Sequence, residues 1–262
     1  MCGIFGYVLK EGLPLTYTIE ILKRLEVFIY PGRQGPIGGH GAGVSYLTPN
    51  GGVFLKKMGK TNGSPVSDLI GSLEFEGVAP KSLLSHVRRA SRVFSETVKY
   101  SVCTQPYKAE CLGDTIIISI HNGFLGNYKE LRDGLSASHR YESAKIELID
   151  SEAFPHVYEE LVEAEGAEKA VEKLFCQMEG NSTVALISLK EDERALSVLH
   201  KGRTVGLSLW KNGEGEVLFS SRWEPVEGVL GELLEEGGFQ RRVFLDYGET
   251  GATYLCFKPH LL

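Results

Sequence analysis

The stretch TIIISIHNGF, residues 115–124, carries the clearest structural signal in the chain. Its apolar part, residues 115–120, is short and rich in isoleucine, which is typical of a buried strand. The pair Asn122-Gly123 near its end ordinarily forms a turn. The same geometry also lets the Asn122 side-chain amide and the Gly123 backbone N–H point at one oxygen atom, as the donors of an oxyanion hole do.

Strands and helices are expected on both sides of this stretch, with no internal repeat and no low-complexity segment. Strands are expected at residues 4–9, 44–47, 53–56, 83–88, 182–189, 195–200, 205–210, 217–221, 239–245 and 252–257. Helices are expected at residues 16–29, 150–163 and 167–178. This order, without a break in composition, predicts an α+β fold of layered sheets and helices in a single domain, residues 1–262.

Composition and charge exclude several classes of protein. The chain has 262 residues, a mass of 28.8 kDa and a formal net charge of −6, with 42% hydrophobic and 24% charged residues. Such a balance is globular and lacks the basic surface that sequence-independent nucleic-acid binding requires. No apolar run approaches the ~20 residues of a membrane helix, and no secretory signal is visible, so we expect no membrane association and a cytoplasmic location.

Cys2 is singled out among the five cysteines by its position. The small side chain permits removal of Met1, which would leave Cys2 with both a thiol and a free α-amine. The α-amine has a pKa of about 7.7–8.0 and so is a proton acceptor within reach of the thiol. The odd number of widely spaced cysteines favours a reducing compartment, and Cys103, Cys111, Cys176 and Cys256 are interpreted as packing residues.

Two charged residues stand at the ends of other expected elements, Arg88 at the end of a strand and Asp150 at the start of a helix. Arg88 ends the strand at residues 83–88, where an arginine can hold a carboxylate with two hydrogen bonds, although a basic surface loop is the simpler interpretation. His86 in the same motif is counted with the substrate-binding candidates, although a histidine there commonly shapes the strand end. Asp150 opens a helix, where it is either an N-cap or the anion that binds a substrate ammonium.

Taken together, these candidate residues indicate the kind of substrate that the site would bind. A nucleophile, two oxyanion donors, a carboxylate clamp and an ammonium acceptor suit an amino acid with a side-chain amide, and glutamine fits.

The other histidines and the acidic pairs of the chain form no such set. The histidines His40, His139, His156, His200 and His260 share no metal-ligand spacing, and Glu159-Glu160 and Glu235-Glu236 are interpreted as solvated helix faces.

The opening MCGIFGY, residues 1–7, resembles the start of class II glutamine amidotransferase domains, which belong to the N-terminal nucleophile hydrolases. Further motifs similar to those of this family follow in its order: SHVRRAS (85–91), QPY (105–107), HNGFLGNY (121–128) and IDSE (149–152). Residues 201–203 and 219–222 are similar to its closing region, so the resemblance spans about residues 1–225.

The resemblance implies a four-layer αββα sandwich and a role for each candidate. Cys2 would be the nucleophile after removal of Met1, and Asn122 and Gly123 would form the oxyanion hole. Arg88 would hold the α-carboxylate of L-glutamine, and Asp150 its α-ammonium. The family's reaction cleaves the glutamine amide through a γ-glutamyl thioester and releases ammonia, without a metal or another cofactor.

The chain departs from the family pattern in its second loop, residues 32–43. The family has an R-G-x-D-S-x-G motif there, whereas this loop is longer and lacks the aspartate. Arg33 is the candidate for the arginine that orders this loop near Cys2. Arg89 stands where the family prefers an aromatic residue. These changes bear on specificity and on the behaviour of the loop more than on the thiol chemistry.

The length predicts that the ammonia acceptor lies elsewhere. A glutaminase domain would occupy most of the 262 residues, so we expect a synthase subunit in trans, of the glutamate-synthase type or another. Two alternatives stay open: an N-terminal nucleophile amidohydrolase for another amide, and a non-catalytic glutamine-sensing subunit. The partner chain, removal of Met1 and homo-oligomerisation are also open.

Overall fold

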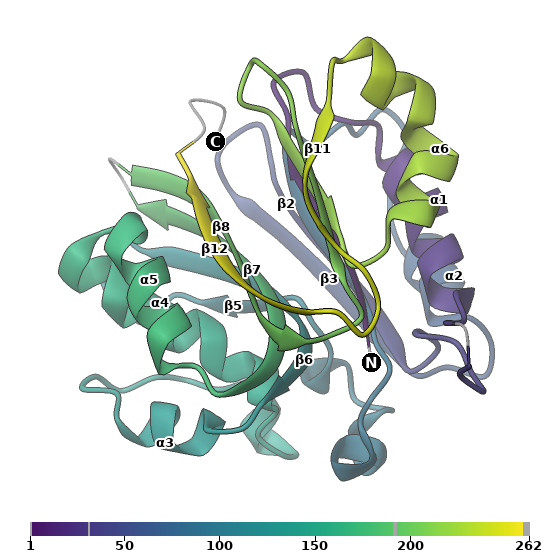
Figure 1. Cartoon of the computed structure of the whole chain (residues 1–262). Coiled ribbons are helices and arrows are strands. Elements are labelled where there is room, and N and C mark those ends of the chain that lie inside the picture. The colour runs from purple at the N-terminus through teal and green to yellow at the C-terminus, as the bar shows by residue number, and fades with distance from the viewer. Residues whose placement is uncertain (1, 31, 191–192, 259–262) are drawn as a thin grey trace.

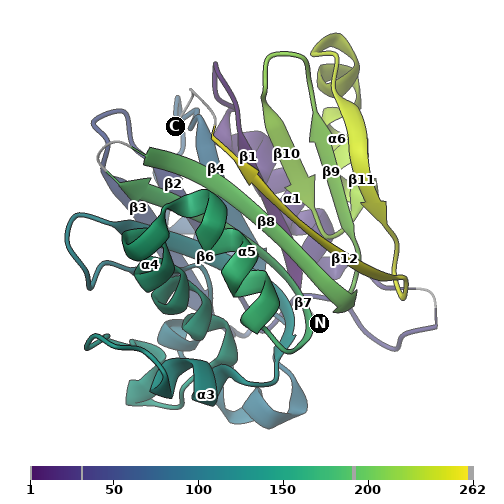
Figure 2. The same ribbon diagram turned by 60° about the vertical axis from the view of Figure 1, so that its left-hand side comes forward.

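A computed structural model describes residues 2–30, 32–190 and 193–258, and these residues form four layers, with two sheets packed face to face between two layers of helices (Figures 1 and 2). The order is helices, sheet, sheet, helices. The fold is therefore a four-layer αββα sandwich, as predicted.

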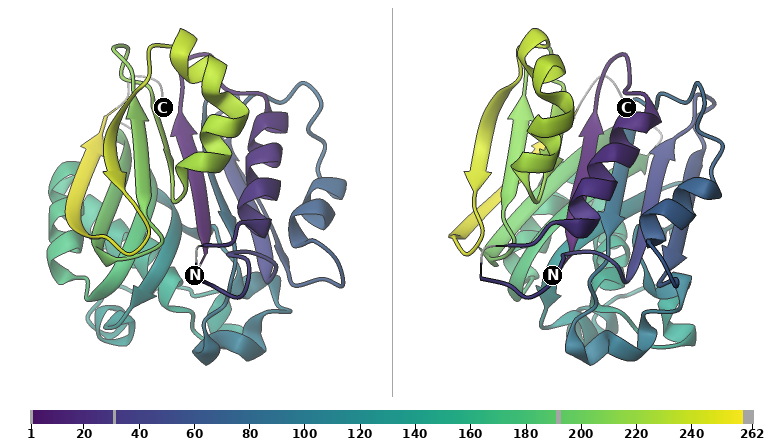
Figure 3. Two further views of the ribbon diagram at one scale, coloured as in Figure 1. Left: turned by 45° about the vertical axis from the view of Figure 1, so that its right-hand side comes forward. Right: turned by 90° about the vertical axis from the view of Figure 1, so that its right-hand side faces the viewer.

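The larger sheet has the strand order β11-β9-β10-β1-β4-β2-β3, and all neighbours are antiparallel. Its strands are β1 (Gly3–Val8), β2 (Gly41–Leu47), β3 (Val53–Gly59), β4 (Ser82–Val87), β9 (Leu207–Lys211), β10 (Val217–Ser220) and β11 (Gln240–Leu245). Its outer face is covered by α1 (Leu15–Val27), α2 (Pro65–Gly71) and α6 (Trp223–Glu236). Figure 3 shows α1 and α6 side by side on this face.

The smaller sheet has the order β12-β8-β7-β6-β5 and is also antiparallel. Its strands are β5 (Tyr107–Ala109), β6 (Ile116–Leu125), β7 (Gly180–Lys190), β8 (Glu193–Arg203) and β12 (Thr250–Phe257). The helices α4 (Ala153–Glu165) and α5 (Ala167–Gln177) cover its outer face, and the short α3 (Tyr128–Asp133) lies beside α4 (Figure 2). The two last strands, β11 and β12, extend different sheets, so the end of the chain ties the sheets together.

Three apolar cores separate these layers. One lies between the larger sheet and α1, α2 and α6, and a second lies between the smaller sheet and α4 and α5. The third lies between the sheets and contains Ile4, Leu84, Ile118, Ile120 and Phe219. Because each sheet is buried on both faces, its central strands are apolar at nearly every position, which is why the isoleucine run of β6 could be recognised.

The alternation of side chains along these strands decides what faces the inter-sheet space. In β1, Ile4 and Val8 point into the inter-sheet core, while Phe5 and Tyr7 point to the helices. In a strand, residues two apart share a face. The inward face of β6 therefore runs from Ile118 through Ile120 to Asn122, and it delivers Asn122 to the end of the inter-sheet core.

Several expectations from the sequence were incomplete or wrong. The last 35 residues were expected to be strands, but residues 223–236 form α6, whose Val226, Leu230 and Leu234 pack on the larger sheet. The helix α2 and the short strand β5 were also missed. Glu159 was interpreted as solvated, but its side chain is fully buried. Pro31, which directly precedes the second loop, and His260 lie outside the described residues.

None of the helices in the described ranges combines the length and the apolar character that crossing a membrane requires.

We predict that Ile118→Ala lowers the free energy of unfolding by about 2–5 kcal/mol, because it leaves a cavity between two closely packed sheets. Ile118 is 1% exposed, whereas Ile146 is 45% exposed and serves as the matched control. Denaturant unfolding of both variants measures the difference. A cost for Ile118→Ala as small as that for Ile146→Ala would contradict the assignment of the inter-sheet core.

Candidate functional site

Five of the seven predicted site residues line one pocket of about 280 Å³ at the end of the inter-sheet space: Cys2, Arg88, Asn122, Gly123 and Asp150. They come from both sheets and from the start of the helical segment that leads into α4. The parity of the strands explains the meeting. Cys2 continues the inward face of Ile4, and Arg88 continues that of Leu84.

Cys2 is tied to both sheets. Its backbone nitrogen donates to the Asn122 side-chain oxygen, at 3.2 Å, and its sulfur accepts from the Arg89 backbone nitrogen, at 3.3 Å. The second contact follows from the pairing of β1 with β4, in which Gly3 lies opposite Val87. The thiol is half-buried at the pocket, so it is held in place but reachable.

Asn122 and Gly123, the two predicted oxyanion donors, both line the pocket. The Asn122 side chain is 1% exposed, and its amide nitrogen has no hydrogen-bond partner among the described residues. Gly123 has φ of 141°, and a Cβ at this position would lie 2.0 Å from the Asn181 carbonyl oxygen. Only glycine fits there, because any side chain would collide with β7.

Arg88 is a buried cation beside this pocket. Its guanidinium is 5% exposed and donates to Thr97, at 3.2 Å to the carbonyl oxygen and 2.6 Å to the hydroxyl. Across the described ranges, Arg88 forms no ion pair with a carboxylate. A buried guanidinium without a counter-anion favours an anionic ligand.

Asp150 is a buried carboxylate at the same pocket, opposite in charge to Arg88. It is 4% exposed, and one carboxylate oxygen accepts from the Leu125 backbone nitrogen at 3.0 Å. Burial raises the pKa of Asp150 to about 6, against the lowering effect of hydrogen bonds from Leu125 and Ser151 and of the Arg88 charge. Burial therefore makes an ionised Asp150 costly, and a cationic ligand would reduce that cost.

A buried network in the wall of the pocket, formed by Gln105, His121 and Ser151, was missed in the sequence, although QPY had been recognised as a motif. Gln105 donates to the His121 carbonyl oxygen at 3.0 Å and to Ser151 at 3.1 Å, and it accepts from the His121 backbone nitrogen. The His121 ring bonds to Ser151 and Ser182, at 2.8 and 3.0 Å. The Gln105–Pro106 peptide bond is cis. The network fixes β6 against the segment that carries Asp150.

The remaining two predicted residues lie outside the pocket lining. His86 is fully buried between the sheets, and burial, reinforced by the Arg88 charge, holds its pKa well below the usual range, so its ring is neutral. Arg33 is exposed and donates to the Tyr247 hydroxyl at 2.8 Å. The role of Arg33 in ordering the second loop stays a prediction, and the contact ties that loop to the segment between β11 and β12.

The second loop meets the pocket through Arg89, the residue that departs from the family pattern. The Arg89 guanidinium donates to the Gly38 carbonyl oxygen at 3.4 Å, and the His40 ring accepts from the Ala90 backbone nitrogen at 3.2 Å. Burial and the nearby cations Arg89, Lys60 and Arg88 lower the pKa of His40 to about 4. An arginine thus connects the loop to the strand that positions Cys2.

The pocket also includes Asn181 and Thr204, which no motif marked, and Arg203, which belongs to the closing-region stretch 201–203 but was not a predicted site residue. The Asn181 side-chain oxygen accepts from the Arg203 backbone nitrogen at 2.8 Å. The pairing of β7 with β6 and β8 brings these residues to the site, so no local pattern could have placed them in the pocket. Among the described residues, no three metal-ligating side chains meet in this pocket.

Comparisons with known proteins find relatives in sequence and in fold. The chain is 29% identical over 226 residues to a protein named glutamine–fructose-6-phosphate aminotransferase (isomerizing) from Sulfurisphaera tokodaii, covering 84% of this chain and 33% of that protein. It is 25% identical over 252 residues to the protein of the same name from Methanothermobacter thermautotrophicus, covering 95% and 36%. The chain thus spans about a third of the length of these curated relatives. No protein-family profile matches it.

Solved structures show the same fold. The glutamine phosphoribosylpyrophosphate amidotransferase of Bacillus subtilis, in complex with ADP and GMP, superposes with a TM-score of 0.60 at 18% identity, covering 97% of this chain and 47% of that one. A structure described as the allosteric regulatory enzyme of purine biosynthesis superposes with a TM-score of 0.63 at 17% identity, covering 97% and 46%. At such identities the likeness shows the fold alone.

We predict that Asp150→Asn stabilises the chain at neutral pH by about 1–3 kcal/mol, because asparagine keeps the acceptor for Leu125 without a buried charge. The folded-state pKa of Asp150 is raised to about 6 from 3.8, so the folded state binds this proton more tightly than the unfolded state. The contribution of Asp150 to stability is therefore largest below pH 4 and is lost as the pH rises through 6.

Denaturant unfolding of both chains between pH 4 and pH 7.5 measures this effect. The advantage of Asp150→Asn should grow with pH and level off above pH 7. An advantage that is independent of pH, or a loss of stability at pH 7, would contradict a buried carboxylate with a raised pKa.

Proposed function

We propose that the chain is a class II glutamine amidotransferase domain that hydrolyses the side-chain amide of L-glutamine to glutamate and ammonia, and its similarity to the proteins described above supports this proposal. The carrying observation is the buried Asn122 amide nitrogen, which has no partner among the described residues and borders the same pocket as the Cys2 thiol. Burying an unpaired donor costs about 1–3 kcal/mol, so its retention favours a task such as binding an oxyanion.

The proposed reaction begins with removal of Met1, which turns the Cys2 nitrogen into an α-amine. The amine accepts the thiol proton, and the sulfur attacks the amide carbon of glutamine. The Asn122 amide and the Gly123 N–H stabilise the negative oxygen of the tetrahedral intermediate. The amine returns the proton to the leaving nitrogen, the C–N bond breaks, and ammonia departs from a γ-glutamyl thioester.

Water completes the cycle. The Cys2 amine accepts a proton from a water molecule, whose oxygen attacks the thioester carbon. The same two donors stabilise the second tetrahedral intermediate. The C–S bond then breaks, the sulfur takes the proton back, and glutamate leaves. The hydrogen bond from the Cys2 nitrogen to the Asn122 oxygen supports this assignment, because it orients the base and the oxyanion donor with one side chain.

Substrate binding is assigned to the two buried charges. Arg88 would hold the α-carboxylate and Asp150 the α-ammonium, so that each charge acquires the counter-ion that it lacks in the empty pocket. His86 would support the strand end from the inter-sheet core. Arg33 would order the second loop through Tyr247. Glutamine, with both charges and a side-chain amide, satisfies all of these groups together.

We also propose that the ammonia reaches an acceptor site on a separate synthase subunit. All described helices and strands of the chain belong to the four layers or to the loops between them. The longer relatives are named for an amination of fructose-6-phosphate, and the acceptor of this chain is open. Co-purification from native cells, followed by a test for glutamine-dependent amination, examines this part of the proposal.

We predict glutaminase activity that depends on Cys2 and Asn122. Cys2→Ala should abolish glutamate formation, because no thioester can form. Asn122→Ala should lower kcat about 10²–10³-fold, because it removes one oxyanion donor. Glutamate release by the purified, Met1-processed chain measures both, with Cys176→Ser as the exposed-thiol control.

The substrate panel and the N-terminal mass decide between this proposal and its alternatives. Activity on asparagine or acylated amino acids in preference to glutamine would favour another amidohydrolase. Glutamine binding without turnover by a chain that retains Met1 in its native cells would favour a sensing subunit. Activity of the processed chain no higher than that of Cys2→Ala, with or without candidate partners, would overturn the proposal.

We further predict that glutamine binding weakens as the pH falls through about 6, because the pKa of Asp150 is raised to about 6 and only its ionised form attracts the ammonium. Calorimetry with the inactive Cys2→Ala chain isolates binding from turnover. The Kd at pH 5 should be about tenfold higher than at pH 7. The Asp150→Asn chain should bind weakly with no such slope, and a flat profile in the parent chain would contradict the role of Asp150.

A further inference from the structure

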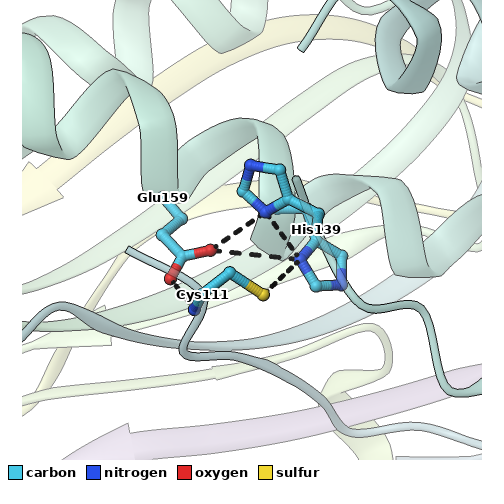
Figure 4. A group of neighbouring side chains, drawn as sticks. Cys111, His139 and Glu159 are labelled. Atoms are coloured by element: carbon cyan, nitrogen blue, oxygen red, sulfur yellow. Dashed lines mark hydrogen bonds and ion pairs between the residues drawn. The ribbon is translucent and has the colours of Figure 1, made fainter. Parts of the chain in front are cut away.

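A second cluster of reactive side chains lies on the far side of the smaller sheet, away from the pocket. We propose that Cys111, His139, His156 and Glu159 bind one divalent transition-metal ion, with Zn²⁺ as the preferred ion. The four residues come from three separate segments: the loop between β5 and β6, the loop after α3, and the helix α4. Figure 4 shows Cys111, His139 and Glu159 pointing toward one another.

The spacing of the four ligand atoms suits tetrahedral coordination. The His139 and His156 Nδ1 atoms are 3.2 Å apart, and the His139 Nδ1 atom is 3.2 Å from the Glu159 Oε2 atom. The Cys111 sulfur lies 3.8 Å from His156 Nδ1, and all four ligand atoms lie within 4.8 Å of one another. Bonds of ~2.0–2.3 Å to Zn²⁺ place tetrahedral ligands about 3.3–3.6 Å apart, so small shifts complete the site.

The surrounding hydrogen bonds turn lone pairs toward the centre. The His139 Nε2 atom lies 3.3 Å from the Glu160 carboxylate, and this contact favours the tautomer with the proton on Nε2, which leaves Nδ1 with a lone pair. Such a carboxylate behind a histidine is the usual partner of a metal ligand. The other oxygen of Glu159 accepts from the backbone nitrogens of Cys111 and Leu112, the latter at 2.9 Å, which turns Oε2 toward the cluster.

Without a cation, this centre is poorly satisfied. When the His139 ring is neutral and carries its proton on Nε2, its Nδ1 lone pair lies 3.2 Å from the Glu159 Oε2 atom, and this buried oxygen then accepts no hydrogen bond within the described residues. The side chains of His139 and Glu159 are 1% and 0% exposed. Acceptors facing one another out of water repel, and a cation at the centre would convert that repulsion into coordination.

The chemical types of the four ligands indicate which metal ion binds and whether its role is structural or catalytic. Thiolate, imidazole and carboxylate together favour zinc over magnesium or calcium, which prefer oxygen ligands. Four protein ligands close a tetrahedral site, which is the pattern of structural rather than catalytic zinc. Binding releases the Cys111 thiol proton to solvent. The metal would join three segments of the outer helical layer, and none of the four ligands lines the glutaminase pocket.

This site was not visible in the sequence. The spacing between Cys111, His139 and His156 fits no familiar pattern, and Cys111 was interpreted as a packing residue. Only His156 and Glu159 stand one helical turn apart on α4. The other ligands reach the site through the packing of two loops onto this helix.

The test uses the full chain in a Cys2→Ala background, because the Cys2 thiol is a competing metal ligand. The chain is stripped with a chelator and titrated with Zn²⁺ or Co²⁺. We expect one ion per chain, a thiolate-to-cobalt charge-transfer absorption, and a rise of about 5 °C or more in the thermal midpoint with Zn²⁺. Cys111→Ser should remove the absorption and most of the rise, and Glu159→Gln should weaken binding at least tenfold.

Cys176→Ser is the matched control, since it removes an exposed thiol on α5 and should change neither signal. Should Cys111→Ser not fold, X-ray absorption of the zinc-loaded parent gives an independent readout, with one sulfur and three nitrogen or oxygen ligands expected. A parent chain that binds no stoichiometric metal, or a Cys111→Ser chain with unchanged absorption and thermal shift, would overturn the proposal. Glutaminase activity does not enter this test, so its outcome is independent of the proposed function.

Discussion

The hydrogen bond from the Cys2 nitrogen to the Asn122 side-chain oxygen joins the two sheets at the point where the chemistry is proposed. Cys2 precedes the first residue of β1 in the larger sheet, and Asn122 lies in β6 of the smaller one. The bond therefore requires the two sheets to pack in one relative position. Ile4, Ile118 and Ile120 in the inter-sheet core impose that position, because closely packed side chains permit little sliding.

The same packing of the two sheets buries charged and polar side chains at the end of the apolar inter-sheet core. Arg88 and Asp150 are buried at the pocket and form no ion pair within the described ranges, where the Asn122 amide nitrogen is also unpaired. Each of these arrangements lowers the stability of the empty chain. The three apolar cores offset this cost, so the pocket can remain prepared for a charged ligand before it arrives. A chain optimised for stability alone would have neutral residues in place of Arg88 and Asp150.

Local patterns predicted most of the strands and helices of the layers, and five of the seven predicted site residues line the pocket. The isoleucine run of β6 marked a strand buried on both faces, and the motifs at Cys2, Arg88, Asn122 and Asp150 each marked the end of an element. Patterns failed where packing decides. In α6, Gly228, Gly231 and Pro225 weaken the helical signal, and contact with α1 stabilises the helix. Asn181 and Arg203 reach the pocket only through the pairing of β6, β7 and β8.

The helix α4 connects the two proposed sites through one stretch of chain. Asp150 lies in the 3₁₀ turn that leads into α4, and His156 and Glu159 follow on the helix itself. Glu152 between them is buried and accepts from the backbone nitrogens of Glu142 and Ser143, at 2.6 and 3.0 Å, which anchors the same turn to the loop after His139. A carboxylate with a raised pKa must be held firmly, since a shift toward water would relax its burial and weaken its attraction for an ammonium. A metal that pins this loop to α4 would therefore support the position of Asp150 from the side opposite the pocket, without touching the substrate.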